Sequence, residues 1–138
     1  MMIKKPNNQY ISKAINYLDS PDNGITELNQ NFKKVIQSKY NSYIASFGGS
    51  IIQSGLLATF MIFEANKEKK KIIEILVNLY NETVDDDTKL IKTDDYFYKT
   101  FESQEESQVK LLRNNLIDMA VSLKLAMRCY EQVDNSNS

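Results

Sequence analysis

Residues 104–132 read QEESQVKLLRNNLIDMAVSLKLAMRCYEQ, and this stretch decides the fold. Its apolar residues recur at intervals of three and four, which predicts one long α-helix. Ser103, with Glu106 three residues later, has the pattern of a capping box and marks the start of that helix. When the helix is wound at about 100° per residue, one wide apolar side faces the core. It consists of Leu112, Leu116, Met119, Leu123, Ala126, Met127 and Tyr130.

A second side of this helix carries positive charge, roughly 130° from the core side. Its cations, Lys110, Arg113, Lys124 and Arg128, fall within about a 60° sector, with Ile117 and Val121 in the middle. The arrangement is either a solvated face, on which long side chains cover two aliphatic residues, or a contact surface for a protein or an RNA backbone. We take the four cations as candidate RNA-binding residues, and Ile117 and Val121 as candidate protein-interface residues.

The rest of the chain follows the same helical period. Further helices are expected at residues 7–19, 25–46, 51–65, 67–81 and 96–101, with a turn at 21–24 and an acidic loop at 83–88. Gly48 and Gly49 should end the helix at 25–46, and Ser50 should cap the next one. Gly55, on an apolar side, should allow a neighbouring helix to approach closely.

No stretch alternates with a period of two for long enough to predict a strand. The predicted fold class is therefore all-α: a single-domain bundle of about five to six helices over residues 1–138, with residues 1–5 and 134–138 flexible.

Composition argues against catalysis. The chain has no histidine and one cysteine, so Ser–His and Cys–His nucleophile pairs cannot form and zinc loses its commonest ligand. The run at residues 85–87 lacks the acid and glycine spacing of a calcium-binding EF-hand loop. We therefore expect no enzyme activity, no metal and no cofactor or small-molecule substrate. With no secretory signal and no apolar run long enough to cross a bilayer, the chain is expected to be cytoplasmic.

Two further groups of lysines are candidates for phosphate contact. Lys67, Lys69, Lys70 and Lys71 lie between two predicted helices, and the alternative is a solvated connector. Lys34 should point outward from the helix predicted at 25–46, where an ordinary solvated face is the alternative. A net charge of −1 argues against strong RNA binding by the chain alone.

Residues 43–60 read YIASFGGSIIQSGLLATF, and here the sequence resembles a known family. In the small subunit of the type III-B CRISPR effector, the Cmr complex, a helix opens on a pattern of the kind Ile-x-x-(Ser/Asn)-Gly-Leu-x-x-(Ala/Thr)-Phe. Ile51, Ser54, Gly55, Leu56 and Phe60 fall near that pattern. The closing segment from Tyr96 to Tyr130 is similar to the long final helix of the family.

The resemblance implies a helical subunit without catalytic activity that stacks as the minor filament of an RNA-guided complex in antiviral defence. Its partners would be the other subunits of the complex, which it would bridge, and guide or target RNA reached through the assembly. Three alternatives stay open. One is the small subunit of a related CRISPR effector, and another is a helical protein-binding module, of inhibitor or antitoxin type, with no RNA role. The third is an enzyme that uses carboxylates or tyrosine.

Overall fold

A computed structural model describes residues 8–20, 23–102 and 104–134. Its helices are α1 (Asn8–Asp19), α2 (Ser38–Ser54), α3 (Leu56–Glu64), α4 (Lys69–Asn81), α5 (Tyr98–Phe101) and α6 (Glu106–Met127), with a 3₁₀ turn, η1 (Asp86–Thr88). Three short strands are β1 (Thr26–Leu28), β2 (Lys34–Gln37) and β3 (Glu131–Val133). The predicted helical bundle is confirmed, with one small sheet added to it.

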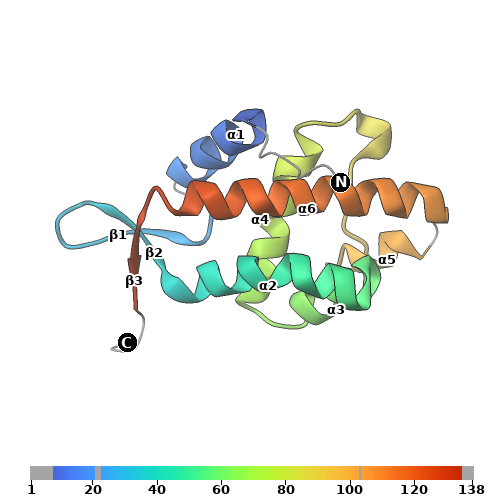
Figure 1. The fold of residues 1–138 in the computed structure, drawn as a ribbon, viewed down its shortest axis with the longest axis horizontal. Helices are drawn as coiled ribbons and strands as arrows, with labels where there is room; N and C mark the ends of the chain where they lie inside the picture. Colours follow the sequence, from blue (N-terminus) through green and yellow to red (C-terminus); the bar gives the residue numbers. More distant parts are fainter. Residues whose placement is uncertain (1–7, 21–22, 103, 135–138) are drawn as a thin grey trace, which may run out of the picture.

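Helix α6 is the central rod of the molecule. It packs against α1, α2 and α4, and Figure 1 shows it running between α1 on one side and α2 with α3 on the other. The predicted core side of α6 is confirmed, because Leu116, Leu123 and Ala126 have no exposed surface. Of the other members, Leu112, Met119 and Met127 are buried, and Tyr130 is partly buried against the core.

The prediction of a helix at residues 25–46 is wrong in its first half. Strands β1 and β2 form an antiparallel hairpin there, and β2 pairs in parallel with β3, so that Ile36 lies opposite both Thr26 and Gln132. In the hairpin tip the Asn29 side-chain oxygen accepts hydrogen bonds of 2.9 Å from the backbone N–H groups of Asn31 and Lys33. Asparagine competes with a helix in this way.

The break after α2 lies at a different glycine from the one predicted. Gly48 and Gly49 are inside α2, and Ser50 is no N-cap, since its hydroxyl shares a 2.9 Å hydrogen bond with that of Thr59. The helix ends at Gly55, whose φ of 87° suits glycine. Apart from Gly55 and its two chain neighbours, the described residues place no atom within 4 Å of where a Cβ on Gly55 would be, so the expected close approach of a helix is also wrong.

The predicted long helix ends earlier than expected. Helix α6 stops at Met127 instead of residue 132, because residues 131–133 pair with β2 as strand β3. Ser103, the proposed cap, lies outside the described residues. The predicted ends at 1–5 and 135–138 lie outside them too, whereas Asp134 accepts a 2.9 Å hydrogen bond from the hydroxyl of Ser38.

Two buried polar side chains fix the connections between helices. Asn23 donates to the carbonyls of Leu18 and Ser20, at 2.8 and 2.6 Å, and accepts from the N–H groups of Ile25 and Thr26. It therefore holds the end of α1 against the start of β1.

Glu64, at the end of α3, accepts hydrogen bonds from the N–H groups of Phe97 and Tyr98, at 2.8 and 3.0 Å. These bonds cap α5. Burial raises the pKa of the Glu64 carboxyl, and the two backbone donors offset that rise in part.

Candidate functional site

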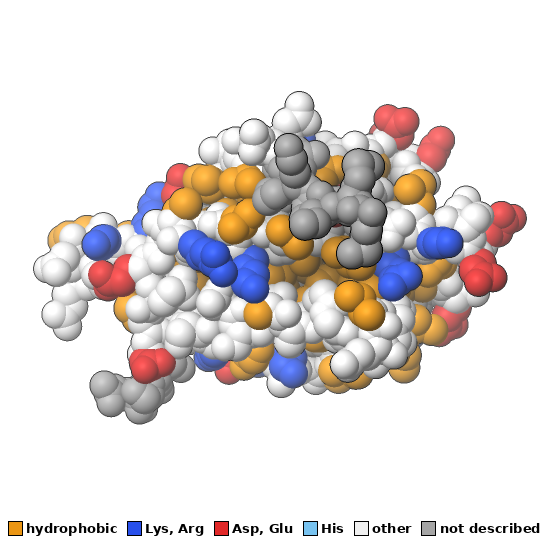
Figure 2. Space-filling view, in the orientation of Figure 1, with side chains coloured by type: hydrophobic (Ala, Val, Ile, Leu, Met, Phe, Trp, Pro, Cys, Tyr) orange, Lys and Arg blue, Asp and Glu red, His pale blue; other side chains and the backbone are white. Residues whose placement is uncertain are grey.

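Three of the four predicted cations lie along one line of α6, and the fourth, Arg128, directly follows the end of the helix. Lys110, Arg113, Lys124 and Arg128, with Ile117 and Val121 between them, follow each other at steps of three or four residues, which keeps them on one side. We call these six residues the basic face. Figure 2 shows Lys and Arg side chains toward both ends of α6 on this side of the molecule, with hydrophobic side chains between them.

The cations of the basic face have no ion-pair partner among the residues that the structure describes. Lys110 and Arg128 are exposed, whereas Arg113 and Lys124 are half-buried. The Nε of Arg113 is enclosed without a hydrogen-bond acceptor in the same described part of the chain. Of these cations, Lys110 and Arg128 are the most open to an external anion, whereas the enclosed Nε of Arg113 is not.

The apolar centre of the basic face lies beside a shallow groove between α6 and α2. Ile117, Ala120, Val121 and Lys124 line a hollow of about 110 Å³ from α6, and Ile44, Ala45 and Gly48 line it from α2. Gly48 leaves open space where a Cβ would stand. The structure therefore brings the predicted interface residues Ile117 and Val121 together with Lys124.

The second lysine group already contacts other side chains of the protein. It consists of Lys67, Lys69, Lys70 and Lys71. We call it the α4 cluster. The Nζ of Lys69 lies 5.6 Å from the ring centre of Tyr43 and 5.5 Å from that of Phe63. Lys70 lies 5.0 Å from the ring of Tyr96.

Lys71 continues the pattern, with its Nζ 5.7 Å from the ring centre of Tyr40 and donating a 3.2 Å hydrogen bond to its hydroxyl. Lys67 is exposed, and within the described ranges it makes no such contact. Three of the four cations thus rest on aromatic rings of the protein itself.

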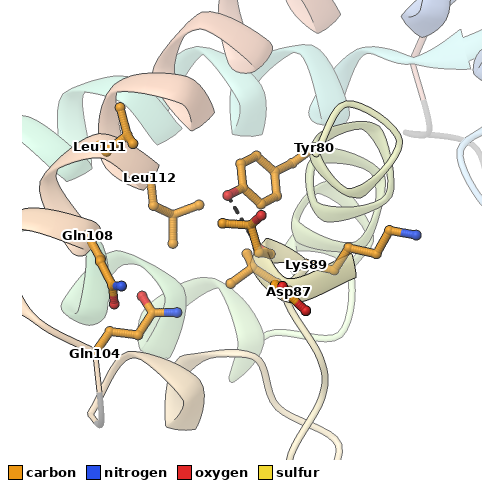
Figure 3. Close-up of a pocket in the computed structure, with 9 residues that line it drawn as sticks. Tyr80, Asp87, Lys89, Gln104, Gln108, Leu111 and Leu112 are labelled. Carbon is orange, nitrogen blue, oxygen red and sulfur yellow. Dashed lines mark hydrogen bonds between the residues drawn. The ribbon is translucent and has the colours of Figure 1, made fainter. Parts of the chain in front are cut away.

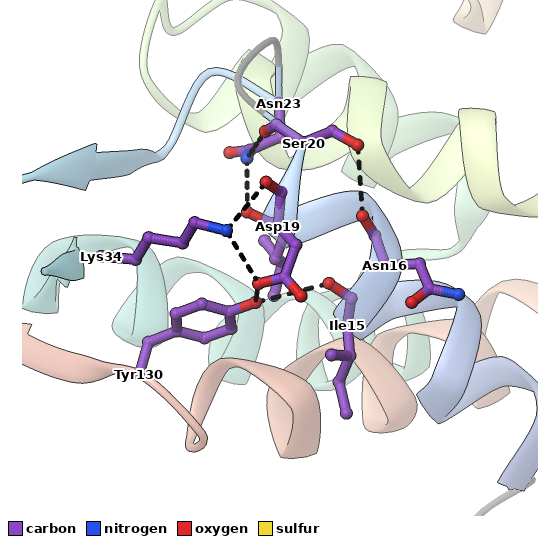
Figure 4. A network of polar contacts seen from close by, with 8 residues as sticks. Ile15, Asn16, Asp19, Ser20, Asn23, Lys34 and Tyr130 are labelled. Carbon is purple, nitrogen blue, oxygen red and sulfur yellow. Dashed lines mark hydrogen bonds and ion pairs between the residues drawn. The ribbon is translucent and has the colours of Figure 1, made fainter.

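Lys34 is also held by the protein. Its Nζ donates a 3.1 Å hydrogen bond to the carbonyl of Asp19 and lies 3.4 Å from a carboxylate oxygen of the same residue. Tyr130 donates its hydroxyl to that carboxylate, as Figure 4 shows. This hydrogen bond, together with the charge of Lys34, lowers the pKa of the Asp19 carboxyl. Burial and the Asp19 carboxylate raise the pKa of Tyr130. Asp19 therefore joins α1 to β2 through Lys34 and to the segment after α6 through Tyr130.

A hollow of about 130 Å³ lies between η1, the end of α4 and the start of α6. Figure 3 shows Tyr80, Leu111 and Leu112 as its apolar walls, with Gln104 and Gln108 among its polar groups. Asp87 and Lys89 are the charged residues lining it, so it contains no pair of carboxylates for acid–base work.

The described part of the chain offers no cluster of three or more His, Cys, Asp or Glu residues that could hold a metal ion. Among the described helices, none is both long and apolar enough to span a membrane.

Sequence reasoning missed the aromatic partners of the α4 cluster and the α2 side of the groove. Tyr43 lies 26 positions before Lys69 in the chain and Tyr96 lies 26 positions after Lys70, so helical spacing alone gives no sign of these contacts. The small residues Ala45 and Gly48 did carry a signal, because they are spaced three apart on one helix.

Comparison with known protein families gives one match. The family model described as CRISPR-associated protein (Cas_Cmr5) matches residues 23–133, which span every element from the hairpin to β3 and every candidate residue above. No curated protein and no solved structure matches the chain.

Proposed function

This chain belongs to the Cas_Cmr5 family of CRISPR-associated proteins, and from that membership as a subunit of the Cmr complex we propose its role in the complex. It acts as the non-catalytic small subunit of the type III-B effector. In that position it bridges backbone subunits and contacts the phosphates of RNA with the basic face. The family match supports membership of the complex, and the line of cations on α6 supports the proposed contact with RNA.

The observation that carries the RNA contact is the line of cations along and directly after α6, which have no ion-pair partner among the described residues. From Lys110 to its last residue, Met127, the helix rises about 26 Å, at about 1.5 Å per residue, and Arg128 follows directly. A line of that length can follow several successive phosphates of a single strand. Each Lys–phosphate contact releases counterions from the nucleic acid, and this release drives binding.

The proposed contact positions RNA and does not read its sequence. Residues 111–127, between the outermost cations, contain no aromatic side chain on which a base could stack. Phosphate contacts fix register and orientation without sequence information. With a net charge of −1, one copy binds weakly, and binding becomes stronger when several parts of an assembly hold the same strand.

The test is RNA binding by the assembled complex with Lys124→Glu and Arg128→Glu in this chain. We expect weaker binding and a flatter dependence of log K on log salt, by about 0.7 for each phosphate that the variant no longer binds. Thermal unfolding of the variant should nearly match that of the parent chain, since neither residue has an ion-pair partner among the described residues. Unchanged RNA affinity in a correctly assembled complex contradicts the proposal.

The non-catalytic role has its own test. RNA incubated with the purified chain, with and without divalent cations, should remain intact. Cleavage that follows this chain through purification contradicts that part of the proposal. Co-purification with backbone subunits of a different CRISPR effector would contradict the type III-B assignment.

A further inference from the structure

The stretch from the first turn of α2 to the end of α3 has a composition that the basic face does not explain. Between Lys39 and Glu64 the sequence contains no charged residue, although charged residues make up 25% of the chain. Depletion of charge is what distinguishes the centre of a protein interface from ordinary surface. The stretch also contains buried core residues, which are normally uncharged in any protein. Only its exposed side chains can therefore indicate whether it forms an interface.

Helix α3 buries one side and exposes the other. Leu56, Phe60 and Phe63 are buried, and on the opposite side the exposed fractions are 38% for Leu57, 47% for Met61 and 53% for Ile62. Ala58, half-buried, lies between them. We call Leu57, Ala58, Met61 and Ile62 the uncharged face. A helix of a soluble protein normally has a polar outer side, so this face lacks the usual adaptation to water.

Aromatic packing and a hydrogen bond fix helix α3, which carries the uncharged face, on the core. Directly beneath it, the ring of Phe60 packs edge-to-face on that of Phe101 with centres 4.8 Å apart. The ring of Phe63 packs on Phe47 at 5.5 Å, and the Ser50–Thr59 hydrogen bond ties α3 to α2. Apolar side chains fixed in this way lose little freedom on binding.

We propose that the uncharged face packs against an uncharged, apolar surface of a neighbouring protein subunit in the effector complex, which leaves the basic face for RNA. This inference rests on the proposed function, since it requires membership of an assembly. An RNA backbone does not fit the face, because phosphate binding needs cations and the face has none.

A second copy of this chain, bound through the same face, fits less well. A stable dimer buries about 800 Å² on each partner. The outer side of a helix as short as α3 (Leu56–Glu64) supplies much less. A surface of this size suits a subunit that several contacts hold in place at once.

The experiment reconstitutes the complex with Met61→Lys and Ile62→Lys in this chain and measures the share of complexes that contain it by native mass spectrometry. The matched control is Leu28→Lys, which adds the same kind of charge at an exposed leucine of the hairpin, at the other end of the molecule from α3 (Figure 1). We expect incorporation of the α3 variant to fall at least tenfold and that of the control to stay unchanged. Circular dichroism checks that both variants fold, and a single Met61→Gln change serves if the double variant does not.

Three outcomes overturn the inference. One is incorporation of the folded α3 variant at the parental level. Another is self-association of the isolated parent chain that the α3 change abolishes, which would assign the face to a second copy. The third is loss of RNA binding by a fully incorporated α3 variant. If the parent chain itself does not enter the complex, the proposed function fails instead, and the two failures are thereby distinguished.

Discussion

The basic face and the α4 cluster are both rows of cations on a helix, and both were candidates for RNA contact, yet their surroundings differ. Lys124 and Arg128 have no partner in the residues described, whereas Lys69, Lys70 and Lys71 lie over the rings of Tyr43, Tyr96 and Tyr40. A cation on a ring is already stabilised by its own protein and must give up that interaction to bind a phosphate. The two regions thus carry similar positive charge, but the cations of the basic face are more available to a phosphate than those of the α4 cluster.

The largest effect should come from neutralising the whole basic face. In the assembled complex, Lys110→Gln, Arg113→Gln, Lys124→Gln and Arg128→Gln together should weaken RNA binding at least tenfold and reduce the salt slope by about 2.8, at about 0.7 per phosphate. The midpoint of thermal unfolding should stay nearly unchanged. Filter binding across a salt series measures the first and differential scanning calorimetry the second. A large loss of stability with intact RNA affinity would make this face structural.

The same change in the α4 cluster should have the opposite result. Replacing Lys69, Lys70 and Lys71 with Gln removes four cation–ring contacts, at about 0.5–1 kcal/mol each, and should lower the free energy of unfolding by at least about 2 kcal/mol. The salt slope of RNA binding should not change. Urea unfolding measures the stability. If RNA binding falls as much as with the α6 variant, the distinction between the two regions is wrong.

Removing one aromatic ring should free a lysine of the α4 cluster to bind phosphate, as the cations of the basic face are proposed to do. Tyr96→Leu removes the ring beneath Lys70, so stability should fall by about 0.5–1 kcal/mol. The freed Lys70 should then raise the salt slope of RNA binding by at most about 0.7. Adding Lys70→Gln to the same variant should cancel this increase. An increase that survives the second change would have another origin.

The smallest expected effect is a shift in a titration. Burial raises the pKa of the Glu64 carboxyl, and the nearby charge of Lys70 offsets part of that rise. Lys70→Gln should therefore raise the Glu64 pKa further, and Lys124→Gln should leave it unchanged. Carbon-detected NMR of the carboxyl group across a pH series measures both.

The sign of the stability effect follows from the direction of the shift. Because the folded-state pKa of Glu64 is above its unfolded value, the stability that Glu64 contributes is complete below the ordinary glutamate pKa and is lost as pH rises through the folded pKa. Lys70→Gln should move that loss to higher pH. A loss that moves to lower pH would contradict the assignment.

Periodicity predicted the parts of this fold that bury one side of a helix. Helices α1, α4 and α6 and the core residues of α6 were found in this way, since Leu116 and Leu123 repeat at helical spacing. The hairpin was missed because Val35 and Ile36 also fit a helical pattern. Its third strand comes from residues 131–133, and pairing between such distant segments leaves no local signal.

The same limit applies to the candidate surfaces. Spacing predicted that six residues share one side of the last helix, because a single helix determines their relation, and α6 contains five of them. For the α4 cluster and Lys34, the partners are Tyr43, Tyr96 and Asp19, which other elements supply. Whether a lysine is available depends on packing between elements, so it could not be predicted from the charge pattern.

The parallel pairing of β2 with β3 has a consequence for how the chain is made. Ser38 and Asp134, which bond at the open end of this pair, are 96 residues apart. During synthesis the hairpin therefore leaves the ribosome long before its third strand exists, and one edge of β2 stays open until all of the described helices have emerged. An open strand edge can pair with the wrong chain. The nascent protein is thus most exposed to misassembly at the hairpin, where a chaperone bound to the growing chain would protect it.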